Sequence, residues 1–302
     1  MAGFLTDWQV SPASCLSARA GVGQPLTQPW TSHSRPAADI AEPRCFNGTM
    51  DLAAQYGRQY GWRSWQQAYE ALPSLASARV LDLGCSIGDQ SRDLAALGAR
   101  VVGIDGDEKL LACARSRAIP GAMFELGDIR EPAAQGPFDG IWASFVAAYF
   151  PDLSPVLARW RSLLRPGGWI ALTEVSGLFA HEPLSAGVRA LLHAYVYEAR
   201  EVGRYDFEMG DKLESFLAMA GFETETHCLL ADRELSFAGT ADQDVLQAWA
   251  DRLARMPLLQ DRARQANLPL QEDLLRCLAS PAHTTDCRVH FCVARRPQIP
   301  AR

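Results

Sequence analysis

Lysines, paired cysteines and long apolar runs are all scarce in this chain of 302 residues. Only Lys109 and Lys212 are lysines, and the formal net charge is −6. Because nucleic acids and anionic membrane surfaces are bound through basic surfaces, this balance disfavours both as partners. No segment approaches the roughly 18 consecutive apolar residues of a membrane span, so no membrane partner is expected.

The eight cysteines are scattered singly, and no two of them form a C-x-x-C pair. This spacing predicts neither a zinc site nor a disulfide framework, and no metal is expected. The first residues lack a basic stretch followed by an apolar core, so no secretory signal is expected. Together these absences favour a reducing, cytoplasmic location.

Length and composition favour one large globular domain with additions. Residues 1–46 are rich in Ser, Pro, Ala and Gly without a sustained period, which predicts an irregular N-terminal tail. Residues 47–302 are predicted to form the domain itself. Its pattern predicts three helical segments that cover the core, at about 49–72, 177–206 and 241–280.

The stretch V-L-D-L-G-C-S-I-G-D-Q-S at 80–91 is the most informative part of the sequence. It predicts a buried strand, a turn from Gly84 to Gly88 and a helix. A strand, a glycine turn and a helix N-terminus together make a cradle for a polar or anionic group of a nucleotide-like ligand. The dinucleotide fingerprint G-x-G-x-x-G is not met, because Ser86 and Asp89 occupy its second and third glycine positions.

Acidic residues follow the next two predicted strands. Asp105 ends the second strand and follows Asp82 at about the 20-residue separation at which an acid binds ribose hydroxyls. It also suits the N-cap of a helix at 107–117, and the two roles are compatible. Asp128 lies in a third predicted strand region at 123–130. These residues favour a nucleoside ligand.

Three motifs carry a resemblance to a known family. The run from Asp82 to Gly88 resembles motif I of class I S-adenosylmethionine-dependent methyltransferases, D-x-G-x-G-x-G, with Ser86 in place of one glycine. F-D-G-I-W-A-S-F-V at 138–146 resembles their motif IV, and L-L-R-P-G-G-W-I-A-L-T-E at 163–174 resembles their fifth strand with its preceding turn. The chain is identified as a member of this family, most similar to small-molecule methyltransferases of the quinone-biosynthesis type.

The resemblance implies an α/β fold. We expect a doubly wound, seven-stranded, mostly parallel sheet of the Rossmann-like methyltransferase type, with helical lid insertions. The sixth strand is expected at 223–238, and the antiparallel last strand at 288–295.

The resemblance also implies S-adenosyl-L-methionine as the cofactor. In the family, an acid after the second strand binds ribose, and an acid after the third accepts from the adenine amino group. Residues after the fourth strand flank the transferred methyl group, and a tyrosine of the first helix, here Tyr56 or Tyr60, reaches the methionine part. The implied cofactor-binding residues are Tyr56, Asp82, Gly84, Cys85, Ser86, Gly88, Asp105, Gly106, Asp128, Ile129, Ser144 and Phe145.

Methyl transfer is an in-line displacement at a sulfonium carbon, so alignment of the acceptor provides much of the rate. A general base is needed only when the acceptor arrives protonated, and a site without one also fits. His181 and Glu174 are the predicted catalytic residues, because Glu174 ends the fifth strand and His181 follows it in the loop at the ligand-binding edge of the sheet. Many relatives carry a histidine where this chain has Ala148. The other candidate bases are Glu182, His193, Tyr197 and Asp206.

The predicted function is therefore S-adenosylmethionine-dependent methylation of a small molecule, in bacterial secondary or cofactor metabolism. A tRNA or protein methyltransferase is one alternative, and a non-catalytic cofactor-binding or scaffold protein of the same fold is another. Use of the sulfonium in a cyclisation or decarboxylation also stays open. The acceptor, the methylated atom and the oligomeric state, a homodimer included, are not predicted.

Overall fold

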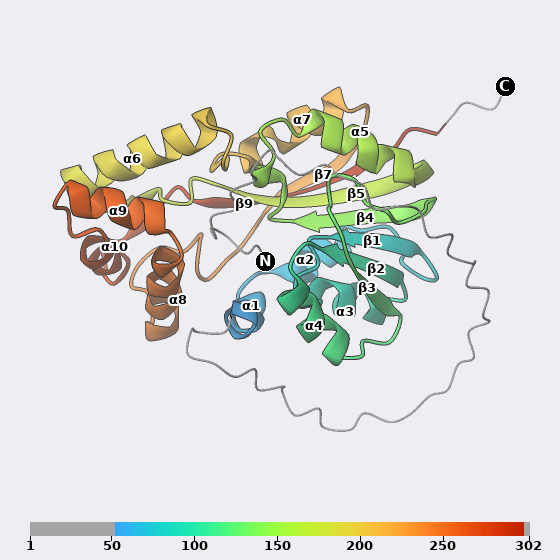
Figure 1. The fold of residues 1–302 in the computed structure, drawn as a ribbon, viewed down its shortest axis with the longest axis horizontal. Helices are drawn as coiled ribbons and strands as arrows, with labels where there is room; N and C mark the ends of the chain where they lie inside the picture. Colours follow the sequence, from blue (N-terminus) through green and yellow to red (C-terminus); the bar gives the residue numbers. More distant parts are fainter. Residues whose placement is uncertain (1–51, 299–302) are drawn as a thin grey trace, which may run out of the picture.

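The computed structural model describes residues 52–298, so the predicted tail at 1–46 and the start of the segment at 49–72 lie outside the described residues. A seven-stranded sheet in the order β3-β2-β1-β4-β5-β9-β7 forms the centre (Figure 1). Its strands are β1 (Arg79–Leu83), β2 (Arg100–Asp105), β3 (Ala122–Leu126), β4 (Phe138–Ser144), β5 (Leu164–Ser176), β7 (Glu223–Leu230) and β9 (Arg288–Arg295). β9 is antiparallel to both of its neighbours, and β1 to β5 are mutually parallel. The predicted fold class is confirmed.

Helices cover both faces of this sheet. α3 and α4 pack on β1 to β3, and α5 and α7 pack on the opposite face (Figure 1). The helices are α1 (Leu52–Tyr60), α2 (Trp65–Glu70), α3 (Asp89–Ala96), α4 (Glu108–Ser116), α5 (Ser154–Leu163), α6 (Ala186–Glu201), α7 (Leu213–Met219), α8 (Gln243–Ala254), α9 (Pro257–Gln265) and α10 (Leu270–Leu278). The short 3-10 turns η1 (Ala147–Tyr149) and η2 (Gly210–Lys212) and a two-stranded sheet of β6 (His181–Glu182) and β8 (Thr284–Thr285) complete the fold.

The central strands are buried on both faces, as parallel strands between helix layers are. In β1, every residue after Arg79 is buried, and Trp142 of β4 is fully enclosed. Trp160 of α5 closes the core on one side of the sheet, and its indole nitrogen donates to the Ile129 carbonyl (2.6 Å). This packing fixes the C-terminal ends of the strands, where the loops that carry the site begin.

Two predicted strands are shorter than expected, and the predictions were wrong in their C-terminal halves. β3 ends at Leu126, and the Asp128 carboxylate accepts from the backbone nitrogen of Arg130 (2.8 Å), which makes a turn. β7 ends at Leu230 because the Asp232 carboxylate accepts from the backbone nitrogens of Glu234 (2.7 Å) and Leu235 (2.8 Å). In both places a local aspartate competes with the strand for backbone donors.

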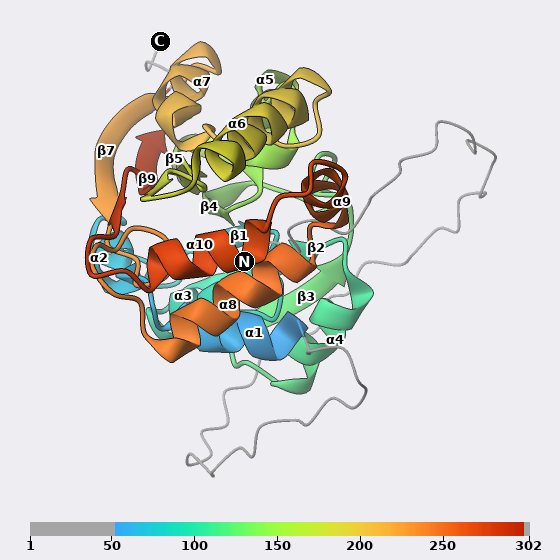
Figure 2. The same ribbon diagram turned by 90° about the vertical axis from the view of Figure 1, so that its left-hand side faces the viewer.

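α1 and α8, far apart in the sequence, run next to each other at the open end of the sheet (Figure 2). Arg255, just after α8, donates to the Gln55 side-chain oxygen, and Arg58 lies 3.9 Å from the Asp251 carboxylate. The segment after β7 therefore reaches back to the first described helix. No helix within residues 52–298 is both long and apolar enough to cross a membrane.

Candidate active site

The loop between β1 and α3 is shaped by residues in the left-handed region. Gly84 has φ +78° and Gly88 has φ +83°. A Cβ on Gly84 would lie 2.3 Å from Cγ1 of Val146, and one on Gly88 would lie 2.8 Å from Cζ of Phe124. Ser86, which replaces a family glycine, also has a positive φ of +51°. Two positions of the motif therefore require glycine for both backbone conformation and space.

Asp82 joins the strand to the helix that follows. Its buried carboxylate accepts from the Ser91 hydroxyl (2.5 Å) at the start of α3. Burial raises the pKa of Asp82 to about 7, and the Ser91 hydrogen bond opposes that rise. This contact holds the loop between them in one shape.

Asp105 joins the same loop to the next strand. Its two oxygens accept from the backbone nitrogens of Ser86 (2.8 Å) and Asp107 (2.9 Å). Each oxygen keeps a further lone pair, which suits two vicinal hydroxyls. Burial raises the pKa of Asp105. The N-cap that was considered for Asp105 belongs instead to Asp107, whose side chain accepts from Lys109 and Leu110 at the start of α4.

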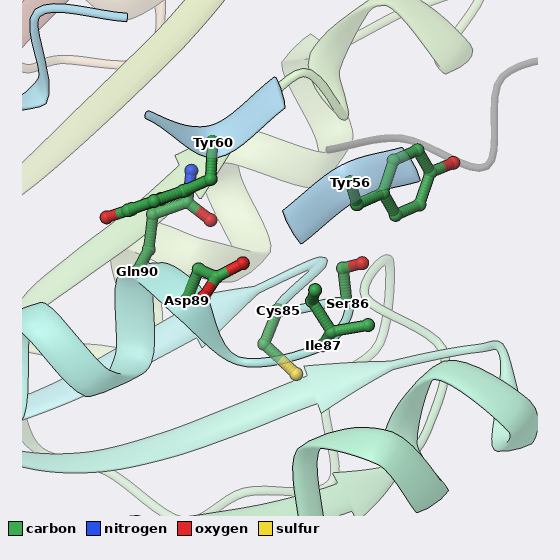
Figure 3. A pocket seen from close by; sticks show the side chains of 7 residues that line it. All are labelled: Tyr56, Tyr60, Cys85, Ser86, Ile87, Asp89 and Gln90. Atoms are coloured by element: carbon green, nitrogen blue, oxygen red, sulfur yellow. The ribbon is translucent and has the colours of Figure 1, made fainter. Parts of the chain in front are cut away.

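A small cavity lies between this loop and α1 (Figure 3). Its volume is about 10 Å³, close to the space that one water molecule needs. The Ser86 hydroxyl is buried there without a hydrogen-bond partner among the described residues. The lining residues are Tyr56, Tyr60, Cys85, Ser86, Ile87, Asp89 and Gln90.

The two tyrosines of α1 differ in their contacts. The Tyr60 hydroxyl bonds to the Tyr69 hydroxyl (2.6 Å) and donates to Asp93 (2.5 Å), so it is engaged with α2 and α3. Tyr56 is buried over the loop, and the guanidinium of Arg255 lies near enough to oppose the rise in its pKa that burial causes. Tyr56 is therefore the tyrosine that connects the loop with α8.

Asp128 lies beyond the end of β3, and its side chain is exposed. It makes a two-pronged hydrogen bond to Arg130, which lowers the pKa of Asp128. Gly106, on the neighbouring loop, has open space around its α-carbon, because a Cβ there would meet the Gly127 oxygen only at 3.9 Å. The strand ends bring Asp105 and Asp128 to one edge, while the Asp128 carboxylate faces Arg130.

The end of β4 carries a strained residue. Phe145 has φ +57°, a conformation that costs a residue other than glycine about 1–3 kcal/mol. Its backbone nitrogen donates to the Thr173 carbonyl (2.7 Å), and its ring is buried. The hydroxyl of Ser144, one residue earlier, is buried without a partner among the described residues. Strain and an orphaned hydroxyl together mark this strand end as a candidate functional position.

Glu174, on β5, is completely buried. One carboxyl oxygen accepts from the backbone nitrogen of Ala148 (3.1 Å), and the other has no hydrogen-bond partner among the described residues. Burial raises the pKa of Glu174 to about 8. It is therefore mainly protonated at neutral pH, and it accepts a proton readily only at higher pH.

Two tyrosines face Glu174, and sequence reasoning did not single out either as a site residue. The rings of Tyr149 and Tyr205 meet edge to face with centroids 5.0 Å apart, and Glu174 contributes to the raised pKa of each hydroxyl. Tyr56 also raises the pKa of Tyr149. Gly84 of the loop lies against Val146, and Ala148 donates to Glu174, so the loop after β1 and the end of β5 meet on either side of the 3-10 turn η1. We refer to Tyr149, Glu174 and Tyr205 as the acceptor-side cluster.

Comparisons with known proteins agree with this geometry. A family model described as a methyltransferase domain matches residues 81–172. The trans-aconitate 2-methyltransferase of Mycobacterium tuberculosis is 30% identical over 206 residues, which cover 65% of this chain and 76% of the relative. The chain belongs to the class I S-adenosylmethionine-dependent methyltransferases. Its cofactor is therefore S-adenosylmethionine.

Other relatives match a shorter part of their own length. The trans-aconitate 2-methyltransferase of Deinococcus radiodurans is 38% identical over 103 residues, 33% of this chain and 39% of the relative. A ubiquinone biosynthesis O-methyltransferase of Aromatoleum aromaticum is 33% identical over 159 residues, 50% of this chain and 66% of the relative. A solved putative methyltransferase of Bacillus halodurans shares the fold, with a TM-score of 0.51 and 19% identity over 78% of this chain and 97% of that one.

The residues of this methyltransferase fit the cofactor. The glycine loop has no room for Cβ atoms, the Ser86 hydroxyl is buried without a partner, and Asp105 has free lone pairs. Within the described part of the chain, no group of three or more His, Cys, Asp or Glu side chains suits a metal ion.

His181 does not have the environment of a general base, contrary to the expectation. It is buried in β6, where its Nδ1 bonds to Nε2 of His283 (2.9 Å) and its ring meets the Trp249 ring edge to face. Burial, with a smaller contribution from His283, lowers the pKa of His181 to about 3. A group with so little affinity for a proton at neutral pH is a poor base. The alternative Glu182 makes two hydrogen bonds to Arg189 (2.6 and 2.7 Å).

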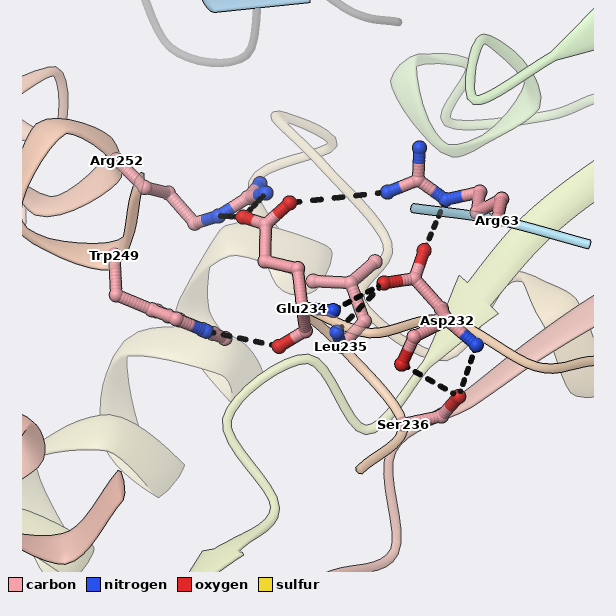
Figure 4. Close-up of polar contacts among 7 residues, drawn as sticks. All are labelled: Arg63, Asp232, Glu234, Leu235, Ser236, Trp249 and Arg252. Carbon is pink, nitrogen blue, oxygen red and sulfur yellow. Dashed lines mark hydrogen bonds and ion pairs between the residues drawn. The ribbon is translucent and has the colours of Figure 1, made fainter. Parts of the chain in front are cut away.

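A buried network of four charged residues joins the segment before α2, the turn after β7 and α8 (Figure 4). We call these elements, together with α1, the cover. Arg63 pairs with Asp232, and Arg252 of α8 pairs with Glu234; Arg63 also lies 3.9 Å from Glu234. The Trp249 indole donates to the Glu234 carbonyl (3.0 Å). We call these four charged residues the ionic network. No local pattern in the sequence signals it, since its members come from three distant segments.

Proposed function

We propose that this chain transfers the methyl group of S-adenosylmethionine to a small-molecule acceptor in the cytoplasm. The observation that carries the proposal is that the acceptor-side cluster lies beside the cofactor loop. Gly84 of the loop packs against Val146, three residues before Tyr149. The backbone nitrogen of Ala148, one residue before Tyr149, donates to Glu174 (3.1 Å). An acceptor bound there would meet a cofactor held at the adjacent strand ends, at the switch point of the sheet.

Each part of the loop has a proposed role toward the cofactor. The Asp105 carboxylate accepts from the two ribose hydroxyls while it holds the Ser86 backbone. The backbone from Gly84 to Gly88, with Cys85 between, approaches the polar methionine end, and Tyr56 covers it. In this role Asp82 orients the loop through Ser91.

The adenine end is proposed to lie beyond β3. Asp128 would accept from the adenine amino group, and the backbone at Ile129 would contact the ring beside Gly106. Arg130 already donates to the Asp128 carboxylate from its backbone nitrogen and from Nε and Nη2 of its exposed side chain. An ionised carboxylate accepts about four hydrogen bonds, so the adenine amino group would displace part of the Arg130 side chain.

The cofactor supplies an activated methyl group, and the chain's task is alignment. Ser144 and Phe145 at the end of β4 are proposed to position the acceptor beside that group. Glu174 is proposed to accept a proton from the acceptor or donate one to it, through the carboxyl oxygen that has no partner among the described residues. A small acceptor suits the relatives, which are named for trans-aconitate and for ubiquinone biosynthesis.

The test is a calorimetric titration with S-adenosylmethionine and S-adenosylhomocysteine, with NAD as the control ligand. We expect binding of the first two and none of NAD. Asp105→Ala should weaken binding of both by at least about tenfold, because hydrogen bonds to a charged group are lost. Glu108→Ala, at an exposed neighbour that pairs with Arg115, should leave the affinity unchanged. Equal affinity of Asp105→Ala and the parent protein would refute the ribose assignment.

Methyl transfer itself is tested by mass spectrometry of small molecules incubated with the protein and the cofactor. A methylated product that requires both would support the proposal. Cofactor binding without any product across extracts of small molecules would favour a non-catalytic protein of the same fold.

A further inference from the structure

Two arginines at the end of α8 differ in how their charges are balanced. The Arg252 guanidinium is buried and paired with the Glu234 carboxylate. Arg255, one turn later, has no carboxylate within ion-pair distance among the described residues, and it donates instead to the neutral amide of Gln55. Its Nε is buried without a hydrogen-bond partner in the part of the chain that the structure describes. Glu234 and Asp251 act on the Arg255 charge only from a longer distance.

Neither of these carboxylates makes a hydrogen bond to Arg255. Glu234 is shared by Arg252 and Arg63, and Asp251 accepts from Gln247 (2.8 Å) and lies 3.9 Å from Arg58. Burial lowers the pKa of Arg255, with a further contribution from Arg252. Removing a charge from water without a counter-ion is costly, so such a guanidinium is expected to gain from an anionic ligand.

The position of Arg255 connects it with the proposed site. The hydrogen bond to Gln55 places the Arg255 guanidinium against α1. Gln55 comes one residue before Tyr56, which lines the cavity at the cofactor loop. Tyr149 of the acceptor-side cluster also lies within electrostatic range of Arg255. The guanidinium thus lies at the border between the cofactor loop and the acceptor-side cluster.

We propose that Arg255 is the specificity-determining residue for an acceptor that carries a carboxylate. This inference rests on the proposed function and names the chemical class of its acceptor. A guanidinium presents a planar set of donors that matches a carboxylate in two parallel hydrogen bonds, and Nε is one of the two donors of that fork. The orphaned Nε is thus a donor that a carboxylate ligand would satisfy.

The experiment uses the full chain saturated with S-adenosylhomocysteine and titrated with a panel of mono-, di- and tricarboxylic acids, trans-aconitate among them. The fully methylated ester of each acid, in which every carboxyl group is esterified, is the neutral control ligand. We expect at least one acid to bind at least about tenfold more tightly than its ester, since charged hydrogen bonds are the stronger ones. Arg255→Met should reduce the affinity for that acid by a similar factor and leave the affinity for S-adenosylhomocysteine unchanged.

Arg264→Met is the matched control, because Arg264 lies in the same insertion with an exposed side chain that pairs with Asp261. It should bind the acid as the parent does. Arg255→Gln provides a second variant, and circular dichroism checks that both fold. If no acid binds, if esters bind as well as acids, or if the Arg255 variants bind the acid normally, the proposal is wrong. If S-adenosylhomocysteine itself fails to bind, the proposed function fails first and this inference falls with it.

Discussion

The cofactor loop and the cover above it are stabilised in opposite ways. In the loop, the decisive contacts join residues close in the sequence, such as Ser86 and Asp105, 19 positions apart. In the cover, the contacts join distant segments, such as Gln55 and Arg255, 200 positions apart. The loop depends on backbone conformation and small residues, whereas the cover depends on the balance of buried charges. A change of one kind should therefore damage one region and spare the other.

The largest effect is expected in the cover. Glu234→Gln removes one negative charge from the ionic network and leaves Arg252 buried without a counter-ion. The free energy of unfolding should fall by about 3–5 kcal/mol, the usual cost of breaking a buried pair. Urea denaturation measures the change. Glu272→Gln, which breaks an exposed pair with Arg276, is the control and should cost less than about 1 kcal/mol.

An equal, small effect of both variants would show that the ionic network is not a structural requirement. The stability of the cover would then come from another source, such as the packing of the Phe179 and His181 rings against Trp249.

The next effect is expected in the loop. Gly84→Ala places a Cβ against Val146 at a positive φ, and it should cost about 1–3 kcal/mol of overpacking together with backbone strain. Val146→Ala in the same chain should recover part of the loss, because it removes the clash and not the strain. A double-mutant cycle from denaturation curves measures that recovery. Strictly additive effects of the two substitutions would contradict the close approach of Gly84 to the Val146 side chain.

The last effect is a dependence of stability on pH, which is the smallest at any one step of pH and accumulates over several units. The pKa of Glu174 rises from 4.5 to about 8 in the folded chain, so between these values the folded state holds a proton that the unfolded state has lost. The contribution of Glu174 to the free energy of unfolding is therefore greatest below pH 4.5. It decreases as the pH rises to 8, by at most about 1.4 kcal/mol for each pH unit. Glu174→Gln removes this contribution, so its unfolding free energy should fall less between pH 5 and 8 than that of the parent.

Denaturation of both proteins at pH 5, 6.5 and 8 provides the comparison. Asp82 titrates in the same direction, with its pKa raised to about 7, and its contribution cancels because both proteins contain it. Parallel pH profiles would mean that Glu174 is not buried as a protonated acid.

The contrast between the regions also explains what the sequence could predict. The apolar strands follow from short local patterns, whereas the sheet topology and the antiparallel β9 were implied by the family resemblance. The R-P-G-G run predicted as a turn before the fifth strand lies within β5, where Gly167 has a positive φ. The roles of Asp232 and Asp128 in ending strands were missed, because an aspartate after an apolar run fits a turn and a strand edge equally well. The buried environment of His181 could not be foreseen, because its partner His283 is 102 positions away in the sequence.

The residues of the cover could not be predicted for the same reason. Arg252 and Arg255 have the same side chain and lie three positions apart, yet Arg252 pairs with the Glu234 carboxylate and Arg255 donates to the neutral amide of Gln55. Only the position of Glu234, fixed by the turn after β7, makes the distinction. A sequence pattern describes what one segment can do alone, and charge balance in a buried space depends on several segments.

The small volume beside Ser86 has a consequence for rates. The methionine end of the cofactor is proposed to lie there, yet the space of about 10 Å³ holds little more than one water molecule, and α1 beside it is joined to α8 through Arg58 and Arg255. If entry of the cofactor requires these contacts to open first, its observed association rate should level off at high ligand concentration at the rate of opening. The contacts between two helices would then set how fast the cofactor enters and leaves, and the loop would set how tightly it is held.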